Sequence, residues 1–260
     1  MDAGVQAAVD LGLDKKVVLV TGGARGVGAG ITRVLAGLGA VPVTCGRTAG
    51  SDSDVEFIAC DVRDPDAVER LVDQIARTHG RLDGVVNNAG GSPFALAADA
   101  SPRFVGKIVD LNLLAPLNVA RAANAVMQQQ EYGGAVVNVS SVSGHRPSPG
   151  TSAYGAAKAG LDSAMTALAI EWAPRVRVNS VICGPVLTEQ SALHYGDEAG
   201  IAAVDATIPM GRMATPEDVG NAVAFLLSPL AGYITGSTIT VHGGGERPAF
   251  LDAATADNRV

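Results

Sequence analysis

The sequence has few aromatic residues, few cysteines and no excess of positive charge. Aromatic side chains make up only 4% of the 260 residues and 32 residues are glycine, so helices and strands are expected to pack closely through small side chains. A net charge of −7 argues against a nucleic-acid-binding surface. The three cysteines are scattered without metal-ligand spacing, which indicates a reducing, cytoplasmic location and no metal site.

Long apolar runs are missing as well. No stretch approaches the ~18 apolar residues of a membrane-spanning helix, and the first dozen residues lack the features of a secretion signal. Repeats and linkers are also absent. The chain therefore predicts a single domain over residues 13–245, preceded by an arm at 1–12. A tail at 246–260 is expected either to cross to a neighbouring subunit or to fray.

Apolar runs that suit strands alternate with helical patterns throughout the chain. The predicted strands lie at 16–20, 41–45, 57–60, 84–86, 135–139, 176–182 and 237–241. Asp64 and Thr215, each followed by proline, are strong helix starts, and 104–127 fits one long helix with a kink at Pro116. This α/β alternation predicts a Rossmann-type, doubly wound, seven-stranded parallel sheet with helices on both faces. The connection 48–54 is too short for a helix and predicts a tight polar loop.

A glycine turn follows the first predicted strand and precedes a helical pattern. Its spacing is Gly-x3-Gly-x-Gly, with Gly22, Gly26 and Gly28. Glycines let the backbone approach a pyrophosphate, and the helix N-terminus offers free N–H groups and partial positive charge. The turn therefore predicts a dinucleotide site, and the Asn-Asn-Ala-Gly sequence at 87–90, after another strand, supports this prediction.

Tyr154 and Lys158 are four residues apart in a helical pattern, so both side chains can face one ligand. A tyrosine with an ordinary pKa near ~10 is a poor acid or base at neutral pH, but a nearby positive charge lowers that pKa. The pair is thereby suited to exchange a proton with an alcohol or ketone. The spacing alone is common by chance. Ser141, thirteen residues upstream, and the glycine turn together make an active site the better interpretation.

With these motifs the chain resembles the short-chain dehydrogenase/reductase family over Leu13 to Gly245. The matching motifs are Thr-Gly-x3-Gly-x-Gly at 21–28, Cys-Asp-Val at 60–62, Asn-Asn-Ala-Gly at 87–90, Asn112, Ser141, Tyr-x3-Lys at 154–158, Asn179 and Gly-Pro-Val-Leu-Thr at 184–188. One departure is Cys183, which precedes Gly184 where the family has proline, in a loop that contacts the nicotinamide end of the cofactor. The resemblance implies an NAD(P)-dependent enzyme acting on CH–OH groups.

The chemistry of the side chains and the resemblance together predict a catalytic set of Asn112, Ser141, Tyr154 and Lys158. Tyr154 would donate the proton in ketone reduction and accept it in alcohol oxidation, while Ser141 hydrogen-bonds the substrate oxygen. Lys158 would lower the pKa of Tyr154 and, by resemblance, bind the nicotinamide ribose. Also by resemblance, Asn112 would hold a water that links Lys158 to solvent. The expected cofactor-binding residues are Gly22, Arg25, Gly26, Val27, Gly28, Arg47, Asp61, Val62, Asn88, Ala89, Gly90, Tyr154, Lys158, Pro185, Val186 and Thr188.

The end of the second predicted strand bears on the choice of cofactor. Enzymes that use NAD place an acid there, whereas a basic residue suits the 2′-phosphate of NADP. This chain has Gly46 followed by Arg47, and Arg25 lies inside the glycine turn. Two guanidinium groups can pair with a phosphate dianion; the alternative is that both are solvated surface charges. The sequence therefore favours NADP(H), with NAD left possible.

The substrate is less well defined. A lid is expected at about 187–213. Its apolar side chains, together with two apolar side chains that follow the Asn-Asn-Ala-Gly turn, suggest an apolar pocket. Such a pocket would suit a lipophilic ketone such as a fatty-acyl or steroid-like compound. These residues are Leu193, Tyr195, Ile201, Ile208, Phe94 and Leu96. They could equally serve lid packing, and His145 and His194 could touch substrate or be bystanders. No basic cluster indicates a phosphopantetheine carrier, so a 3-oxoacyl reductase is open but not favoured.

Two other functions stay open at this point. One is an NAD-dependent alcohol dehydrogenase of the same family running in the oxidative direction. The other is a cofactor-binding regulator without turnover, which the intact set of four catalytic residues disfavours. An enoyl reductase would space its tyrosine and lysine more widely than Tyr154 and Lys158.

The resemblance also implies a homotetramer. Two helices would build one interface and the last strand with the tail a second one, giving D2 symmetry. The small residues expected at the helical interface are Ala120, Ala122, Ala123, Ala125, Ala156, Ala157, Ala159, Gly160, Ala164 and Ala167. Such faces could instead be buried against the sheet of their own subunit.

Overall fold

Seven parallel strands form one sheet in the part of the chain that the computed structural model describes, residues 10–50 and 54–255. The strand order is β3-β2-β1-β4-β5-β6-β7. The strands are β1 (Val17–Thr21), β2 (Val41–Gly46), β3 (Glu56–Ala59), β4 (Gly84–Asn87), β5 (Gly134–Ser141), β6 (Val176–Cys183) and β7 (Thr238–Val241). This confirms the predicted single-domain Rossmann-type sheet.

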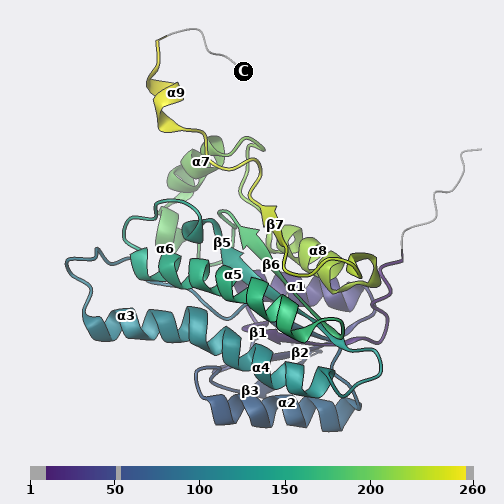
Figure 1. Ribbon diagram of the computed structural model, residues 1–260. Coiled ribbons are helices and arrows are strands. Elements are labelled where there is room, and N and C mark those ends of the chain that lie inside the picture. The colour runs from purple at the N-terminus through teal and green to yellow at the C-terminus, as the bar shows by residue number, and fades with distance from the viewer. Residues whose placement is uncertain (1–9, 51–53, 256–260) are drawn as a thin grey trace, which may run out of the picture.

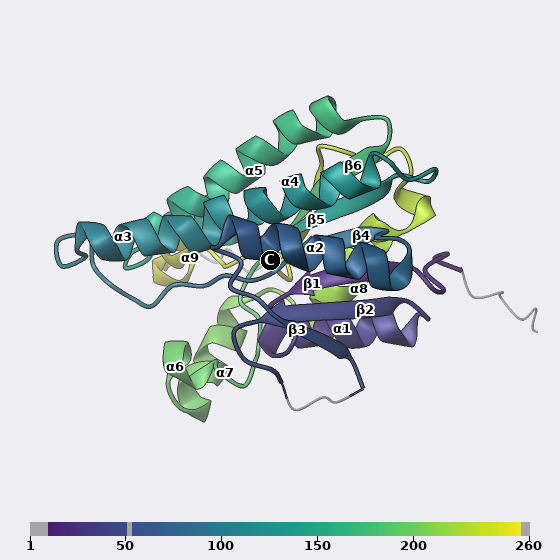
Figure 2. The ribbon, with the colours of Figure 1, turned by 90° about the horizontal axis from the view of Figure 1, so that it is seen from below.

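Helices cover both faces of the sheet (Figures 1 and 2). On one face lie α2 (Pro65–His79), α4 (Ala115–Met127) and α5 (Ser152–Trp172), and on the other lie α1 (Gly26–Gly37) and α8 (Pro216–Leu227). The remaining α-helices of the described residues are α3 (Pro102–Val109), α6 (Ala192–Tyr195), α7 (Glu198–Thr207) and α9 (Ala249–Ala253). The predicted starts of α2 and α8 are confirmed, because the side chains of Asp64 and Thr215 accept from backbone N–H groups in the first turns.

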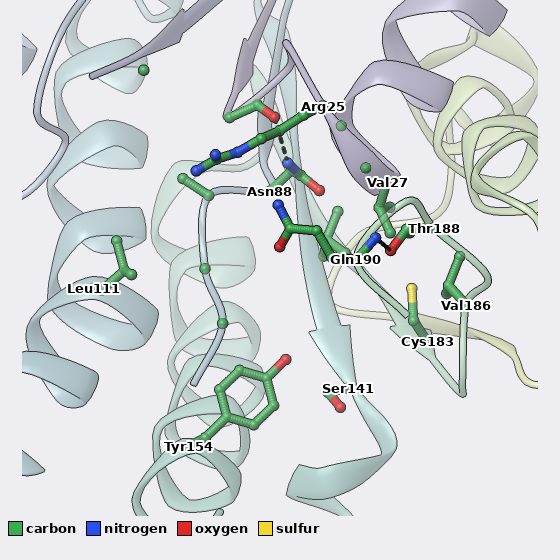
Figure 3. Close-up of a pocket in the computed structure, with 18 of the residues that line it drawn as sticks. Arg25, Val27, Asn88, Leu111, Ser141, Tyr154, Cys183, Val186, Thr188 and Gln190 are labelled. Carbon is green, nitrogen blue, oxygen red and sulfur yellow. Dashed lines mark hydrogen bonds between the residues drawn. The ribbon is translucent and has the colours of Figure 1, made fainter. Parts of the chain in front are cut away.

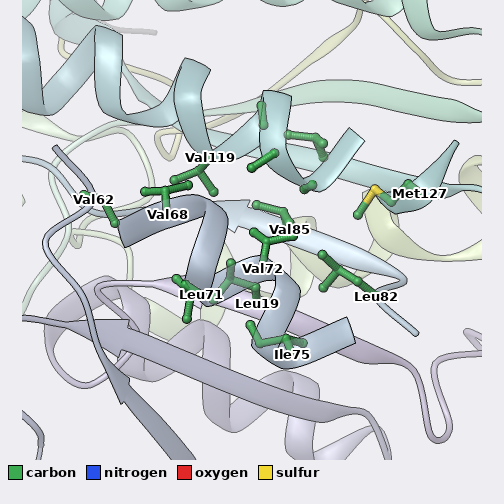
Figure 4. Packing of buried hydrophobic residues seen from close by; sticks show 14 of the residues in the cluster. Leu19, Val62, Val68, Leu71, Val72, Ile75, Leu82, Val85, Val119 and Met127 are labelled. Carbon is green, nitrogen blue, oxygen red and sulfur yellow. The ribbon is translucent and has the colours of Figure 1, made fainter. Parts of the chain in front are cut away.

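The central strand β1 is buried on both faces, as its continuous apolar sequence requires. Val17 and Leu19 belong to the core under α2 and α4, whereas Val18 and Val20 belong to the core under α1 and α8. Figure 4 shows the first of these cores, where Leu71 and other side chains of α2 meet Leu19 and its neighbours. Because successive strand residues point to opposite faces, one short strand contributes to both cores.

Small residues bring α1 and α8 into close contact, as the composition predicted. A Cβ on Gly30 of α1 would lie 2.2 Å from Cβ of Pro216. A Cβ on Gly220 of α8 would lie 2.8 Å from a methyl carbon of Val34. Larger side chains at either glycine would force the helices apart.

The long helix predicted at 104–127 is interrupted, and the prediction of a simple kink at Pro116 was wrong in detail. Between α3 and α4 the chain makes a π-helical turn, Asp110–Leu114, in which Ala115 N–H donates to the Asp110 carbonyl five residues back. Pro116 follows directly and has no N–H to offer Asn112, four residues earlier. The wider turn is therefore placed where an ordinary helical hydrogen bond is lost, and it carries Asn112.

The structure bears on two other predicted segments. The predicted lid contains α6 and α7, which lie above the carboxyl ends of the strands in Figure 1. No helix joins β2 to β3 among the described residues, although 51–53 of that short loop lie outside them. The arm at 1–9 and the end of the tail, 256–260, also lie outside the described residues, so the division into arm, domain and tail stays a prediction. None of the described helices is long and apolar enough to cross a membrane.

Candidate active site

Two turns meet at the carboxyl ends of β1 and β4, where the strand order reverses. Thr21 Oγ1 accepts from the backbone N–H groups of Asn88 and Ala89, both at 3.0 Å. Asn88 Nδ2 in turn donates to the carbonyl oxygens of Thr21, at 2.9 Å, and Gly22, at 3.2 Å. These bonds join the glycine turn to the Asn-Asn-Ala-Gly turn.

The glycine turn forms a cradle that only glycine permits at two positions. Gly22 has a φ of +64°, in the left-handed region. A Cβ on Gly28 would lie 2.2 Å from the Gly22 carbonyl oxygen. The turn therefore packs tightly against the start of α1, whose first residues line the cavity. N–H groups at a helix N-terminus suit the phosphates of a dinucleotide.

A cavity of about 520 Å³ runs along this edge of the sheet, within the size range of small-molecule sites. Every residue predicted for catalysis or cofactor binding lines it, with the exception of Asn112. In Figure 3, Tyr154 and Ser141 lie at one end and Arg25 lies toward the other. The structure thus brings together residues that are up to 166 positions apart, from Gly22 to Thr188. Their individual roles remain predictions.

Tyr154 and Lys158 lie on successive turns of α5 and face the carboxyl end of β5. Lys158 is buried, and its Nζ donates to the carbonyl oxygen of Val139 at 2.7 Å. The same Nζ is 5.7 Å from the centre of the Tyr154 ring. Ser141, the last residue of β5, lies at the same end of the cavity as Tyr154, and its hydroxyl lowers the pKa of the phenol. A hydroxyl pair that can address one oxygen atom is therefore backed by a buried amine.

Burial dominates the pKa values of this pair. Burial raises the pKa of Tyr154 to about 12, although the Ser141 hydroxyl partly opposes the rise. Burial lowers the pKa of Lys158 to about 8, against the opposing effects of Cys183 and Asp162. The sequence predicted a lowered pKa for Tyr154. The structure gives a raised one, because the loss of water around the buried phenolate dominates.

Asn112 lies behind the cavity and is fully buried. Its Oδ1 accepts from Gly91 N at 2.8 Å, and its Nδ2 donates to the Gly91 carbonyl at 3.0 Å and to the Ile108 carbonyl at 2.9 Å. The side chain therefore clamps the segment after the Asn-Asn-Ala-Gly turn to the π-helical turn. The predicted role of Asn112 in holding a water stays a prediction.

Positive groups gather at the end of the cavity away from Tyr154. Arg25 and Arg47 are exposed and line it together with Arg63. Arg63 donates to both carboxylate oxygens of Asp61, at 2.9 and 2.5 Å, and this pairing lowers the pKa of Asp61 to about 2. The sequence singled out Asp61 but missed its partner. The Asp-x-Arg spacing was the available signal.

Cys183 continues β6 where the resembling family has proline. It pairs with Ser141 on β5 and with Val241 on β7. Cysteine keeps the backbone N–H that proline lacks, so the strand can run through this position. Its Sγ is seen in the cavity in Figure 3, and burial raises the thiol pKa to about 12. The thiol is therefore neutral at neutral pH.

Glu189 is a lid residue that the sequence interpretation missed. Its Oε1 accepts from Gly26 N at 3.0 Å, at the first residue of α1. A carboxylate is favourable there because the helix N-terminus carries partial positive charge. The same N–H belongs to the predicted phosphate cradle, so Glu189 holds the lid against the part of the site where a phosphate would bind.

The lid does not provide the apolar pocket that the sequence suggested. Of the six side chains expected to form it, only Tyr195 lines the cavity. Phe94, Leu96 and Leu193 are exposed, whereas Ile208 is buried. The other residues of the predicted lid that line the cavity are Thr188, Glu189, Gln190 and His194, so its wall there is largely polar. No group of described residues has the composition of a metal site.

Known proteins resemble the chain over most of its length. A family model described as Enoyl-(Acyl carrier protein) reductase matches residues 22–246. Dehydrogenase/reductase SDR family member 4 of Homo sapiens is 36% identical over 245 residues, which are 89% of this chain and 88% of the relative. The 3-oxoacyl-(acyl-carrier-protein) reductase FabG of Vibrio cholerae is 34% identical over 243 residues, 90% and 98% of the two chains.

The fold has close counterparts among solved structures. The ligand-free aldohexose dehydrogenase of Thermoplasma acidophilum matches with a TM-score of 0.86 at 28% identity, covering 95% of this chain and 98% of the other. Sheet order, glycine cradle and Tyr-x3-Lys pair agree with the sequence similarity. The chain therefore belongs to the short-chain dehydrogenase/reductase family and is an NAD(P)-dependent oxidoreductase acting on alcohol or carbonyl groups.

Proposed function

We propose that this protein reduces a ketone or aldehyde to an alcohol with NADPH. The observation that carries the proposal is the arrangement of the cavity, with the Tyr154 and Ser141 hydroxyls at one end and the arginines at the other. The glycine cradle and the N-terminus of α1 lie between them and would hold the pyrophosphate. When bound, the nicotinamide supplies the hydride that becomes the new C–H bond.

The chain's own contribution is binding and proton transfer. Tyr154 donates its phenolic proton to the substrate oxygen, and Ser141 donates a hydrogen bond to the same oxygen as negative charge develops. With its pKa raised to about 12, Tyr154 carries its proton at neutral pH, as a donor in reduction must, but burial also makes that proton harder to release. Lys158, with a pKa of about 8, carries its charge at neutral pH and loses it above that value.

The preference for NADPH rests on the arginines. Arg25 and Arg47 can approach the 2′-phosphate, and Asp61 is already paired with Arg63. NAD lacks this phosphate, so its binding would not be strengthened by the two arginines. We also propose a cytoplasmic location, which the three free cysteines support.

The lipophilic substrate suggested by the sequence has little support from the cavity lining. A substrate with polar groups near the carbonyl is a second candidate, favoured by Gln190, His194 and Tyr195 in the wall. The relatives span both classes, because one is named an acyl-carrier-protein reductase and another an aldohexose dehydrogenase. We therefore propose a carbonyl substrate, and a direct comparison of lipophilic and polar carbonyl compounds decides between the two classes.

A substrate panel tests the proposal. Fatty-acyl, steroid-like and polyhydroxylated carbonyl compounds, and the corresponding alcohols, are each assayed with NADPH or NADP and with NADH or NAD, reading the absorbance of the reduced nicotinamide. We expect reduction of at least one carbonyl class, faster with NADPH. Cofactor binding without turnover of any compound would instead support a cofactor-binding regulator.

Glu189→Gln is expected to tighten NADPH binding several-fold at low salt. The carboxylate and the pyrophosphate compete for Gly26 N–H, and the amide removes a negative charge beside the phosphates. Fluorescence titration of NADPH measures the dissociation constant. Glu198→Gln on α7, also in the lid but outside the cavity lining, is the matched control. Equal dissociation constants for Glu189→Gln and the wild type would show that the contact does not oppose the cofactor.

We further propose that the protein is a homotetramer. Of the alanines expected at the helical interface, some are buried within the subunit, namely Ala120, Ala122, Ala123 and Ala157. Ala156, Ala159 and Ala167 on α5 are exposed, and Ile170 on the same helix is 81% exposed. Light scattering should give about four times the chain mass of 26.2 kDa. A fully active monomer would contradict this proposal.

A further inference from the structure

Asp162 is a buried carboxylate that the proposed chemistry leaves unexplained. It lies on α5, one turn beyond Lys158, and its side chain is 8% exposed. Its Oδ2 accepts from Ser140 Oγ at 2.6 Å and lies 2.9 Å from His145 Nε2. Its Oδ1 is buried and has no hydrogen-bond partner among the described residues. A half-satisfied buried carboxylate is unfavourable for folding, which points to a role other than packing.

Three consecutive residues at the end of β5 lie beside one face of α5. Each of them has a counterpart on a different turn of the helix, and the helical residues involved are four positions apart and share a face. Hydrogen bonds join Val139 to Lys158 and Ser140 to Asp162, and Ser141 lies at the same end of the cavity as Tyr154. Asp162 is therefore the third member of a series whose other two members are predicted catalytic groups.

The segment after Ser141 lies directly on α5. A Cβ on Gly144 would lie 2.8 Å from Ala159 N, and a Cβ on Gly155 would lie 2.5 Å from the Ser143 carbonyl oxygen. The Asp162 side chain contacts a residue on each side of the turn Val142–Gly144. Ser140 precedes this turn and His145 follows it. A single carboxylate oxygen thus ties both ends of 140–145 to the helix.

We propose that Asp162 is a positioning residue that holds the Ser141 hydroxyl in register with Tyr154. This inference rests on the proposed function, because it assumes that both hydroxyls address one substrate oxygen. Ser140, His145 and Asp162 do not form a nucleophilic triad, since Ser140 is 2% exposed and donates to the carboxylate rather than to the histidine. The carboxylate acts through Ser141, and small displacements of a reacting group can cost up to about 100-fold in rate.

Asp162→Asn and Ser140→Ala test the proposal in the full-length protein. Asp162→Asn keeps the shape of the side chain and removes the charge, while Ser140→Ala removes only one donor. We expect kcat for carbonyl reduction to fall about 10-fold or more in each variant. The dissociation constant for NADPH should stay within about twofold, and the double variant should be no slower than Asp162→Asn, because the two residues act as one unit.

Ser180→Ala is the matched control. Ser180 is a buried serine on the neighbouring strand β6, and its hydroxyl has no hydrogen-bond partner among the described residues. Its removal should leave kcat unchanged. Hydrogen–deuterium exchange of the free protein gives a readout independent of activity, and amides in 141–146 should exchange faster in Asp162→Asn than in the wild type while the rest of the sheet is unchanged.

The outcomes separate this inference from the proposed function. A wild-type protein that reduces no carbonyl compound would overturn the proposed function and the inference with it. An active wild type, with turnover lost in Tyr154→Phe but retained in Asp162→Asn or Ser140→Ala, would overturn the inference alone. An equal loss in Ser180→Ala, or a parallel loss of NADPH binding, would assign Asp162 a general structural role and also overturn it.

Discussion

Tyr154→Phe should lower kcat by about 10²–10⁴-fold, the contribution expected of a general acid. The substitution removes only the hydroxyl that donates the proton, and the ring that packs 5.7 Å from Lys158 Nζ is retained. The dissociation constant for NADPH should therefore change little. Steady-state rates at saturating cofactor, together with fluorescence titration, measure both quantities.

Tyr132→Phe provides the control for this prediction. Tyr132 is 76% exposed and does not line the cavity, so loss of its hydroxyl should leave the rate unchanged. If Tyr154→Phe retained more than about a tenth of the wild-type rate, the assignment of Tyr154 as proton donor would be wrong.

Arg47→Asp should reverse the order of cofactor affinities. In the wild type we expect NADPH to bind at least several-fold more tightly than NADH, because hydrogen bonds to a charged group contribute about 1.5–3 kcal/mol. Aspartate at the end of β2 would repel the 2′-phosphate and accept from the 2′-hydroxyl. Titrations of both cofactors against both proteins measure the change, and we expect the ratio of dissociation constants to shift by about tenfold or more.

Arg103→Asp serves as the charge-matched control. Arg103 is exposed on α3 and lies outside the cavity lining, so its substitution makes the same change in net charge without touching the cofactor. Equal affinities of the wild type for NADPH and NADH would refute the role given to Arg25 and Arg47. The preference for NADP would then have to be abandoned.

Local patterns were enough to predict the sheet and most of the cavity. Short apolar runs with intervening helical patterns defined the strands, because both faces of a parallel sheet are buried and its strands are continuously apolar. The glycine spacing from Gly22 to Gly28 and the Tyr154–Lys158 spacing predicted the site. Each spacing has a geometric cause, a tight turn or a shared helix face, that can be read from neighbouring residues. A resemblance to one family then placed Asp61 and Thr188 in the same cavity, and the end of the second predicted strand placed Arg47 there.

Features that depend on tertiary contacts were not predictable in this way. The π-helical turn that carries Asn112 lies where Pro116 lacks the N–H of an ordinary helical hydrogen bond. The periodicity of apolar residues does not reveal this turn. The raised pKa of Tyr154 follows from its burial in the folded chain. The contact of Glu189 with Gly26 joins residues 163 positions apart, and no local sequence pattern predicts it.

Isotope tracing tests the proposed chemistry most directly. A ketone accepted by the wild type is reduced in ordinary water with NADPH in which both hydrogens at the reactive carbon of the nicotinamide are deuterium, and the product is examined by mass spectrometry and NMR. We predict an alcohol with one deuterium on its carbinol carbon, formed by the wild type and nearly absent with Tyr154→Phe. An alcohol without deuterium, or equal product from Tyr154→Phe, would contradict hydride transfer from NADPH coupled to proton donation by Tyr154.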